Sequence, residues 1–321
     1  MRIEMKKFDV CGSSKQVSRI VMGTMIIGVK NYDESKALLD SALKLGINIF
    51  DLALVYGGGD TERAVGQWMS ERGNREQVFI ITKGAHPNRE RQRVTHFDIT
   101  SDLMDSLARL KTDYIDLYLL HRDDTNVPVG PVVDVLNKHL KEGRIRAFGG
   151  SNWTHARIAE ANAYAKANGL APMTASSPNY GLCEQVADPW GPGCVTVSGP
   201  AEAAAREFYR EQAIPVFAYS SLGRGMLSGR VTRENHKELL DGAALKAYAH
   251  EVNFRRLDRA RTMAAQKNVT VPQIALAYIV NQPFRVFPIV GAASEQELSE
   301  AVTASEITLT EKECRWLDTG E

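Results

Sequence analysis

The 321-residue sequence has no net charge and few cysteines. Its 39 lysines and arginines are balanced by 39 aspartates and glutamates, so it lacks the basic field that holds nucleic acid or an anionic membrane. No apolar run approaches the ~18 residues that a membrane span needs. The opening Met-Arg-Ile-Glu-Met-Lys-Lys has no apolar core and is no secretory signal. We therefore expect a cytoplasmic protein that binds neither nucleic acid nor membrane.

The four cysteines are scattered and form no C-x-x-C pair, which disfavours a structural zinc site. Scattered thiols in a chain of this length are typical of a reducing cytosol. A glycine-rich phosphate fingerprint is missing after the first predicted strand, where Gly23, Thr24 and Met25 stand instead. The nearest match, residues 223–229, is one residue too long and follows a late strand. This absence disfavours a doubly wound dinucleotide fold.

What the sequence does contain is a regular alternation of short apolar runs and helical patterns. The apolar runs predict eight strands, at residues 19–25, 47–50, 78–82, 115–120, 145–149, 174–177, 214–218 and 286–290. Helical patterns follow at residues 33–45, 61–69, 98–110, 132–140, 155–167, 200–212, 254–267, 271–281 and 295–303. This alternation predicts an α/β fold, a (β/α)8 TIM barrel in one domain over residues 1–321, with a doubly wound sheet as the weaker alternative.

Four segments fall outside the repeat. Residues 3–18 predict an N-terminal β-hairpin, which could plug the bottom of the barrel. Residues 309–317 predict an extra C-terminal helix. Residues 179–200 and 222–248 predict two long loops, and long loops in compact domains are usually functional or mobile.

Ionisable residues stand at the ends of three successive predicted strands. Asp51, Lys83 and His121 each end an apolar run, and Tyr56 follows closely after Asp51. The carboxyl ends of barrel strands meet at one face, where barrel enzymes keep their chemistry. Taken singly, these residues could be a helix cap, a solvated charge, a structural histidine and a loop aromatic. Together they predict a proton-transfer site.

Carbonyl reduction suits these four residues, because it needs a hydride on carbon and a proton on oxygen. Tyr56 is the expected proton donor, and the ammonium of Lys83 is expected to lower its pKa from about 10 by stabilising phenolate. Asp51 would hold the charge of Lys83 in place. His121 would orient the substrate oxygen through a hydrogen bond.

The chain resembles the aldo-keto reductase family over nearly its whole length. The resemblance rests on five segments in order, residues 50–57, 81–83, 119–121, 149–153 and 219–225. It implies the reduction of aldehydes and ketones with NADP or NAD, on a barrel without a Rossmann domain. It also assigns the same catalytic roles to the same four residues.

The resemblance further implies a cofactor site. Ser151 and Asn152 match the pair that binds the nicotinamide carboxamide, and Tyr219 matches the aromatic residue that stacks on the nicotinamide. The stretch 220–224 lies where the family's loop wraps the pyrophosphate. The implied cofactor-binding residues are Thr24, Met25, Asp51, Ser151, Asn152, Ser177, Tyr219, Ser220, Leu222, Arg224, Gly291, Glu297 and Glu300.

Two places depart from the family pattern. Ser177 stands where the family often has glutamine, and a hydroxyl cannot replace both an amide donor and an amide acceptor. After the last strand, Ala301 replaces an asparagine and Glu297 occupies a position that is often arginine. A carboxylate repels the 2′-phosphate of NADP but accepts hydrogen bonds from a ribose 2′-hydroxyl. The resemblance implies NADP, whereas Glu297 predicts weakened NADP selectivity and allows the use of NAD, although Arg224 or Arg230 could reach the phosphate.

The substrate end is less clearly encoded. Met25, Trp153, Tyr180 and Trp190 are candidates for its walls, which suit a sugar-derived or cyclic carbonyl and an aromatic aldehyde equally well. A cofactor-binding regulatory protein of the same fold, like the β subunits of potassium channels, is the alternative to an enzyme. A third alternative is a metal-dependent barrel hydrolase, which would need histidines and carboxylates clustered as metal ligands at the strand ends. The natural substrate, the reaction direction and the oligomeric state stay open.

Overall fold

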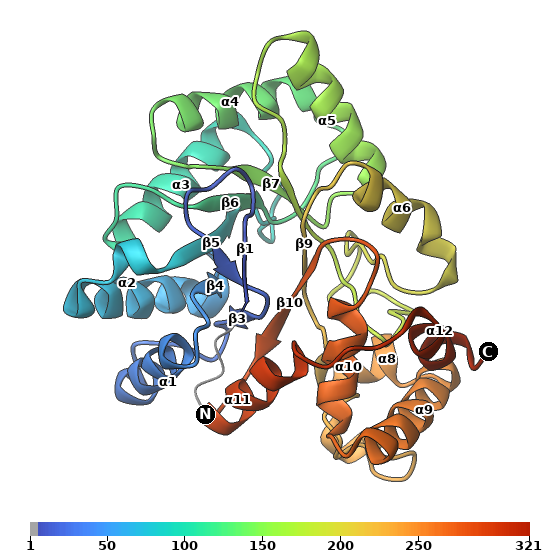
Figure 1. The fold of residues 1–321 in the computed structure, drawn as a ribbon. Helices are drawn as coiled ribbons and strands as arrows, with labels where there is room; N and C mark the ends of the chain where they lie inside the picture. The colour runs from blue at the N-terminus through green and yellow to red at the C-terminus, as the bar shows by residue number, and fades with distance from the viewer. Residues whose placement is uncertain (1–5) are drawn as a thin grey trace.

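A computed structural model describes residues 6–321 and shows a closed barrel of parallel strands ringed by helices (Figure 1). The strands follow one another around the barrel in the order β10-β3-β4-β5-β6-β7-β8-β9. They are β3 (Val21–Gly23), β4 (Ile49–Asp51), β5 (Phe79–Gly84), β6 (Leu117–Leu120), β7 (Phe148–Ser151), β8 (Ala175–Ser177), β9 (Val216–Ala218) and β10 (Val286–Gly291). The predicted (β/α)8 barrel is confirmed.

The helices lie outside the barrel, and several begin at a threonine cap. The side chain of Thr95 accepts a hydrogen bond from the backbone of Asp98, and Thr270 forms a reciprocal capping box with Gln273. The helices are α1 (Tyr32–Lys44), α2 (Asp60–Arg72), α3 (His96–Leu110), α4 (Val129–Lys141), α5 (His155–Ala167), α6 (Ala203–Glu211), α7 (His236–Leu239), α8 (Gly242–Tyr248), α9 (Glu251–Lys267), α10 (Val271–Val280), α11 (Glu295–Ala304) and the extra C-terminal helix α12 (Glu311–Thr319).

Side chains of each strand alternate between two cores. Along β6, Leu117 and Leu119 belong to the cluster inside the barrel, whereas Tyr118 and Leu120 belong to the cluster between the strands and the helices. A strand buried on both faces needs a nearly continuous apolar run. This requirement explains why apolar runs in the sequence predicted the strands.

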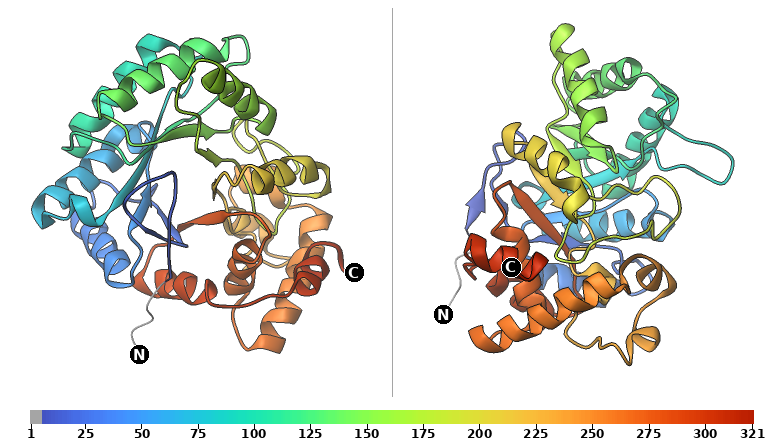
Figure 2. Two further views of the ribbon diagram at one scale, coloured as in Figure 1. Left: turned by 45° about the horizontal axis from the view of Figure 1, so that its top comes forward. Right: turned by 90° about the vertical axis from the view of Figure 1, so that its right-hand side faces the viewer.

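A hairpin covers the N-terminal opening of the barrel. β1 (Lys7–Phe8) pairs antiparallel with β2 (Val17–Ser18), and the ribbon crosses the opening (Figure 2, left). Val10 and Val17 join the core inside the barrel, so the hairpin plugs it as expected. Residues 3–5 of the predicted hairpin lie outside the described residues.

The segment 222–248 is not the plain loop that the sequence pattern predicts. It contains a 3-10 turn, η4 (Gly223–Gly225), and the short helices α7 and α8. Asp241 caps α8, since its side chain accepts a hydrogen bond from the backbone of Ala244. These helices are too short for an amphipathic period to emerge, which is why the pattern missed them. The other predicted loop carries only isolated bridges, from Asn179 to Thr196 and Tyr219.

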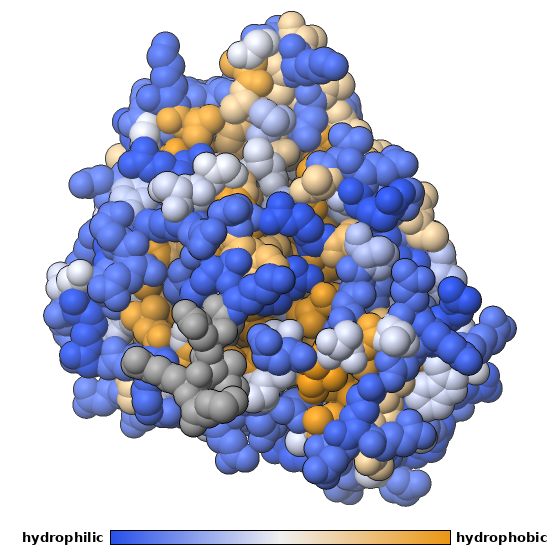
Figure 3. All heavy atoms as spheres, in the orientation of Figure 1, coloured by the Kyte–Doolittle hydropathy of each residue, from blue (hydrophilic) through white to orange (hydrophobic). Residues whose placement is uncertain are grey.

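The surface shows little apolar area on the face that carries the hairpin. That face is mostly hydrophilic, with apolar residues in small scattered patches (Figure 3). Within residues 6–321, no helix combines the length and the hydropathy that crossing a membrane requires.

Candidate active site

Three neighbouring strands bring polar side chains to one end of the barrel. Asp51 ends β4, Lys83 lies near the end of β5, and His121 directly follows β6. These strands are adjacent in the barrel. All three side chains are buried, with exposed fractions of 3%, 2% and 8%. Buried ionisable groups that converge in this way need specific partners, because isolated charges are costly to bury.

The ammonium of Lys83 is the centre of the group. Its Nζ lies 2.7 Å from Asp51 Oδ1, and it donates hydrogen bonds to Asp51 Oδ2 and the carbonyl oxygen of Leu52, both at 2.8 Å. It also donates to the hydroxyl of Tyr56 at 3.3 Å. Burial opposes the charge, but the attraction of Asp51 and Tyr56 outweighs it and raises the pKa of Lys83. Lys83 is therefore a cation aimed at the Tyr56 oxygen.

Tyr56 begins a glycine-rich turn, η1 (Tyr56–Gly59). Gly57 and Gly58 have φ values of 57° and 64°, a region that other residues rarely adopt. The backbone N–H of Leu54 donates to the carbonyl oxygen of Lys83 at 2.9 Å, which ties the turn to β5. The glycines let the chain reverse so that the phenol returns over Lys83.

The pKa of Tyr56 corrects an expectation from the sequence. Burial raises this pKa, and the opposing effect of Lys83 is smaller. The sequence predicted a pKa lowered by Lys83, which ignored the cost of burying a phenolate. Tyr56 therefore keeps its proton at neutral pH, as a proton donor must.

His121 stands beside Tyr56 as a neutral imidazole. The two rings meet edge to face, with centroids 5.9 Å apart, and His86 packs on the other side at 4.8 Å. Burial lowers the pKa of His121 well below its usual value, and the charge of Lys83 adds to this effect. Its Nδ1 is buried without a partner. A neutral imidazole offers one donor and one acceptor to a ligand.

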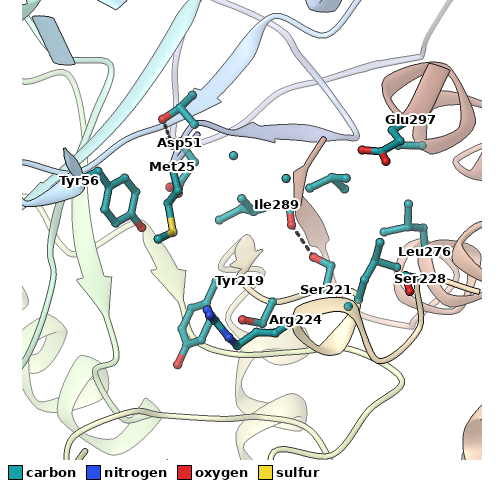
Figure 4. A pocket seen from close by; sticks show the side chains of 18 of the residues that line it. Met25, Asp51, Tyr56, Tyr219, Ser221, Arg224, Ser228, Leu276, Ile289 and Glu297 are labelled. Atoms are coloured by element: carbon teal, nitrogen blue, oxygen red, sulfur yellow. Dashed lines mark hydrogen bonds between the residues drawn. The ribbon is translucent and has the colours of Figure 1, made fainter. Parts of the chain in front are cut away.

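A cleft of about 910 Å³ opens beside these residues. Figure 4 shows Tyr56 and Met25 at one end of it and Glu297 at the other, with Ser221 hydrogen-bonded to Ile289 between them. Of the residues singled out in the sequence, the cleft is lined by Thr24, Met25, Asp51, Tyr56, Lys83, His121, Ser151, Asn152, Tyr219, Ser220, Leu222, Arg224, Gly291, Glu297 and Glu300.

Ser177 is the predicted cofactor-binding residue that the cleft does not include, and the predicted substrate walls Trp153 and Tyr180 are fully buried and do not line it either. Ser177 ends β8 and is fully buried, and its Oγ has no hydrogen-bond partner. Its carbonyl oxygen accepts hydrogen bonds from Ser151 Oγ at 2.9 Å and from the backbone of Asn152 at 3.3 Å. The expectation that Ser177 touches a cofactor is therefore corrected: it supports the two residues in front of it.

The side chain of Asn152 is already fully bonded. Its Nδ2 donates to the carbonyl oxygen of His121 at 3.2 Å and to Ser151 Oγ at 3.3 Å. Its Oδ1 accepts from the backbone of Val195 at 3.0 Å and from the hydroxyl of Tyr219 at 2.7 Å. A ligand amide can bond to Asn152 only in exchange for one of these contacts.

Two loops meet over the same end of the cleft. Trp190 packs on Tyr219 with ring centroids 5.9 Å apart, and the guanidinium of Arg224 lies 5.0 Å from the centre of the Trp190 ring. Arg224 also forms an ion pair with Asp241. Tyr219, which directly follows β9, thus contacts residues of both long loops through Trp190.

Some residues that line the cleft received no role from the sequence. They include Arg122, Gln273, Ser294 and Gln296. Arg122 could have been found, since it directly follows His121 at a strand end, whereas Gln273 lies on α10 and carries no local signal. Within residues 6–321, no three histidine, cysteine, aspartate or glutamate residues cluster as metal ligands do.

Comparison with known proteins decides the family. The model described as Aldo/keto reductase family matches residues 19–319. The chain belongs to the aldo/keto reductase family. The resemblance drawn from the five sequence segments is confirmed.

Relatives of this aldo/keto reductase include several proteins named as reductases. It is 30% identical to aldo-keto reductase YhdN of Bacillus subtilis, over 95% of this chain and 89% of the relative. It is 29% identical to norsolorinic acid reductase A of Aspergillus parasiticus, over 95% of this chain and 78% of the relative. These similarities support an oxidoreductase role.

Two further similarities bear on fold and on function. A probable voltage-gated potassium channel subunit beta of Oryza sativa subsp. japonica is 26% identical, over 92% of this chain and 89% of the relative. The solved structure of a thermostable aldo-keto reductase with the inhibitor epalrestat has a TM-score of 0.74 and 24% identity. It covers 98% of this chain and 99% of that one. The similarity to this solved structure supports the fold alone.

Proposed function

We propose that this aldo/keto reductase interconverts an aldehyde or ketone and the corresponding alcohol with a nicotinamide cofactor, using Tyr56 as the proton donor. One observation carries the proposal: Lys83 Nζ donates hydrogen bonds to Asp51 Oδ2 and to the hydroxyl of Tyr56, and forms an ion pair with the Asp51 carboxylate. A phenol beside a fixed ammonium can release its proton to an alkoxide, because the cation stabilises the phenolate that remains.

The cleft fits an extended dinucleotide on several counts. Its volume, about 910 Å³, lies in the range of cofactor sites. A side chain at Gly291 would meet nothing within 4 Å, so the space beside the end of β10 is open. His121 Nδ1 and Arg224 Nε are buried without partners. Tyr219 and Ser151 would hold the nicotinamide end, and Arg224 would hold the pyrophosphate.

When bound, a reduced nicotinamide supplies the hydride. The side chains of the protein orient the substrate and supply the proton. His121, kept neutral by burial, donates a hydrogen bond to the carbonyl oxygen and turns it toward Tyr56. Tyr56 gives its proton to that oxygen as negative charge develops. Lys83, held by Asp51, stabilises the phenolate, and solvent returns a proton to Tyr56 afterwards.

The test is the reduction of generic aldehydes by the wild type and by Tyr56→Phe. Loss of general acid catalysis should lower kcat by a factor of about 10² to 10⁴, while fluorescence titration shows that the nicotinamide still binds. Tyr164→Phe is the matched control, because Tyr164 lies on α5 and its hydroxyl bonds only to Asp134. Full activity in Tyr56→Phe would refute the proton-donor role.

We also propose that NAD serves as cofactor. The segment 289–301 holds no lysine or arginine, and Glu297 lines the cleft there, with its Oε2 accepting a hydrogen bond from the backbone of Ala293 at 2.8 Å. Lys44, which reaches this helix from α1, is paired with Glu295. A carboxylate at this position favours a ribose 2′-hydroxyl over a 2′-phosphate.

A regulatory role is the second candidate, favoured by the similarity to the probable potassium channel subunit of Oryza sativa. A regulatory protein would bind the nicotinamide cofactor with little turnover. Absence of aldehyde reduction at saturating cofactor, together with measurable cofactor binding, would favour this candidate over the enzyme.

A further inference from the structure

Arg122 is a cation at the substrate end of the cleft. It directly follows His121, lines the cleft and is partly buried. Its Nη1 donates a hydrogen bond to the carbonyl oxygen of His121 at 3.0 Å, and its Nη2 lies 3.7 Å from Cys194 Sγ. The indole N–H of Trp153 donates a hydrogen bond to the backbone carbonyl oxygen of Arg122 at 3.1 Å. These three contacts fix the position of Arg122 beside His121.

The charge of Arg122 has no partner among the residues that the structure describes. A guanidinium has five N–H donors, and the two contacts above leave three of them without a protein acceptor in residues 6–321. No carboxylate there lies within 4.0 Å of it: the adjacent Asp123 pairs with Arg157 instead. By contrast, Lys83 is paired with Asp51, as noted above.

The other cleft cations are already committed or lie elsewhere. Arg224, which we assign to the pyrophosphate, is paired with Asp241 and stacks on Trp190. Arg230 is exposed and sits on the stretch that follows η4. Arg122 is therefore the cation beside Tyr56 and His121 that is free to meet an anion.

The cleft that Arg122 lines also has exposed apolar walls. Met25, Val55 and Trp190 all line the cleft, and 64%, 39% and 48% of their surfaces are exposed. Figure 4 shows the thioether of Met25 beside Tyr56. Apolar side chains exposed in a cleft bind the apolar part of a ligand.

We propose that the substrate class is carbonyl compounds that carry a carboxylate on an apolar body, with Arg122 binding the carboxylate while the carbonyl faces Tyr56. The assignment rests on the proposed reductase function and deepens it. The fork of a guanidinium matches the two oxygens of a carboxylate, and a charged acceptor strengthens each bond. The apolar body lies against Met25 and Trp190.

The experiment compares 4-carboxybenzaldehyde with its neutral methyl ester, methyl 4-formylbenzoate. The two aldehydes share the ring and the reacting group and differ in charge. The wild type should show a kcat/KM at least about tenfold higher for the carboxylate, carried mainly by KM. Arg122→Gln should bring the ratio close to one, and Arg122→Lys should leave an intermediate ratio because the charge stays and the fork is lost.

A matched control removes a nearby charge that does not line the cleft. Arg89 is exposed on the loop after β5, and Arg89→Gln should keep the ratio of the wild type. Reduction of both aldehydes by the wild type with equal kcat/KM would overturn the assignment and leave the reductase function intact. A ratio unchanged in Arg122→Gln would overturn it as well.

Failure of the reductase function would look different. If neither aldehyde is reduced, titration of the wild type and Arg122→Gln with benzoate, followed by tryptophan fluorescence, still decides the anion site. Binding that weakens at least about tenfold in the variant supports the assignment, and equal binding or none overturns it.

Discussion

Lys83 is the residue on which the proposed chemistry depends. Its compact ammonium reaches Asp51, the carbonyl oxygen of Leu52 and Tyr56 at once, which the planar fork of an arginine could not do. Burial opposes this charge, which Asp51 maintains, and the same burial raises the pKa of Tyr56. One environment thus keeps the phenol protonated at rest and provides the cation that stabilises its anion.

At the residue scale, we propose that Glu297 sets the preference between NAD and NADP. We expect the wild type to use NADH with a kcat/KM at least equal to that for NADPH. Glu297→Arg should shift the ratio toward NADPH by about tenfold or more, because a repulsive carboxylate becomes a charge-assisted donor to the 2′-phosphate. Steady-state kinetics with both cofactors measures the ratio.

The control for this change lies on the same turn of α11. Glu295 pairs with Lys44 and does not line the cleft, so Glu295→Arg should move the ratio much less. A wild-type preference for NADPH of about 100-fold, ~2.7 kcal/mol, would contradict the assignment of Glu297.

At the scale of elements, α2 and α3 pack so closely that only glycine fits at their contact. A Cβ at Gly66 would lie 2.3 Å from the carbonyl oxygen of Arg109. Arg109 in turn donates from Nη1 to the carbonyl oxygen of Leu54 at 3.2 Å, behind the turn that carries Tyr56. The helix contact therefore supports the turn from outside the barrel.

Gly66→Ala should lower the free energy of unfolding by about 1–3 kcal/mol through overpacking, although alanine is the better helix former. Gly242 is the matched helical glycine, because a Cβ there would meet nothing within 4 Å. Gly242→Ala should cause no loss of stability. Urea unfolding of both variants measures the difference, and a Gly66→Ala protein as stable as the wild type would show that the helices can move apart.

The stability of the whole molecule should depend on pH through a buried histidine. His139 on α4 is fully buried, with Nε2 3.0 Å from Thr100 Oγ1 and Nδ1 accepting from Arg144 at 3.2 Å. Burial lowers the pKa of His139 to about 4, and the charge of Arg144 adds to this. The folded protein therefore holds the neutral imidazole.

The direction of this pH dependence follows from the pKa of His139 in the unfolded chain and in the folded protein. His139 takes up a proton near pH 6.5 in the unfolded chain and only near pH 4 in the folded protein. Its contribution to the free energy of unfolding is therefore fully present above pH 6.5 and is lost as the pH falls. The loss from this residue should approach about 3 kcal/mol at pH 4. Chemical unfolding of His139→Gln across this range should show a shallower slope. His96→Gln, which changes an exposed histidine, should follow the wild type, and an equal slope in all three proteins would contradict the role of His139.

The sequence determined the architecture and the order of the catalytic candidates. Both depend on local pattern: a strand buried on two faces must be apolar throughout, and a polar residue that ends it must emerge at the carboxyl end of the barrel. For that reason the sequence pattern alone predicts that Asp51, Lys83 and His121 lie on adjacent strands. The helix 155–167 has the same bounds in sequence and structure, because Thr154 caps it and Gly169 follows it.

Tertiary structure alone decided properties that depend on distant neighbours. The pKa of Tyr56 rises because the surrounding barrel excludes water, which no spacing encodes. Ser177 lies behind the cleft, and Arg122 has no carboxylate partner within residues 6–321, because of contacts made by other strands and loops. α8 was missed since seven residues show no helical period. Periodicity is a property of a few consecutive residues, whereas burial and pairing are properties of the folded whole.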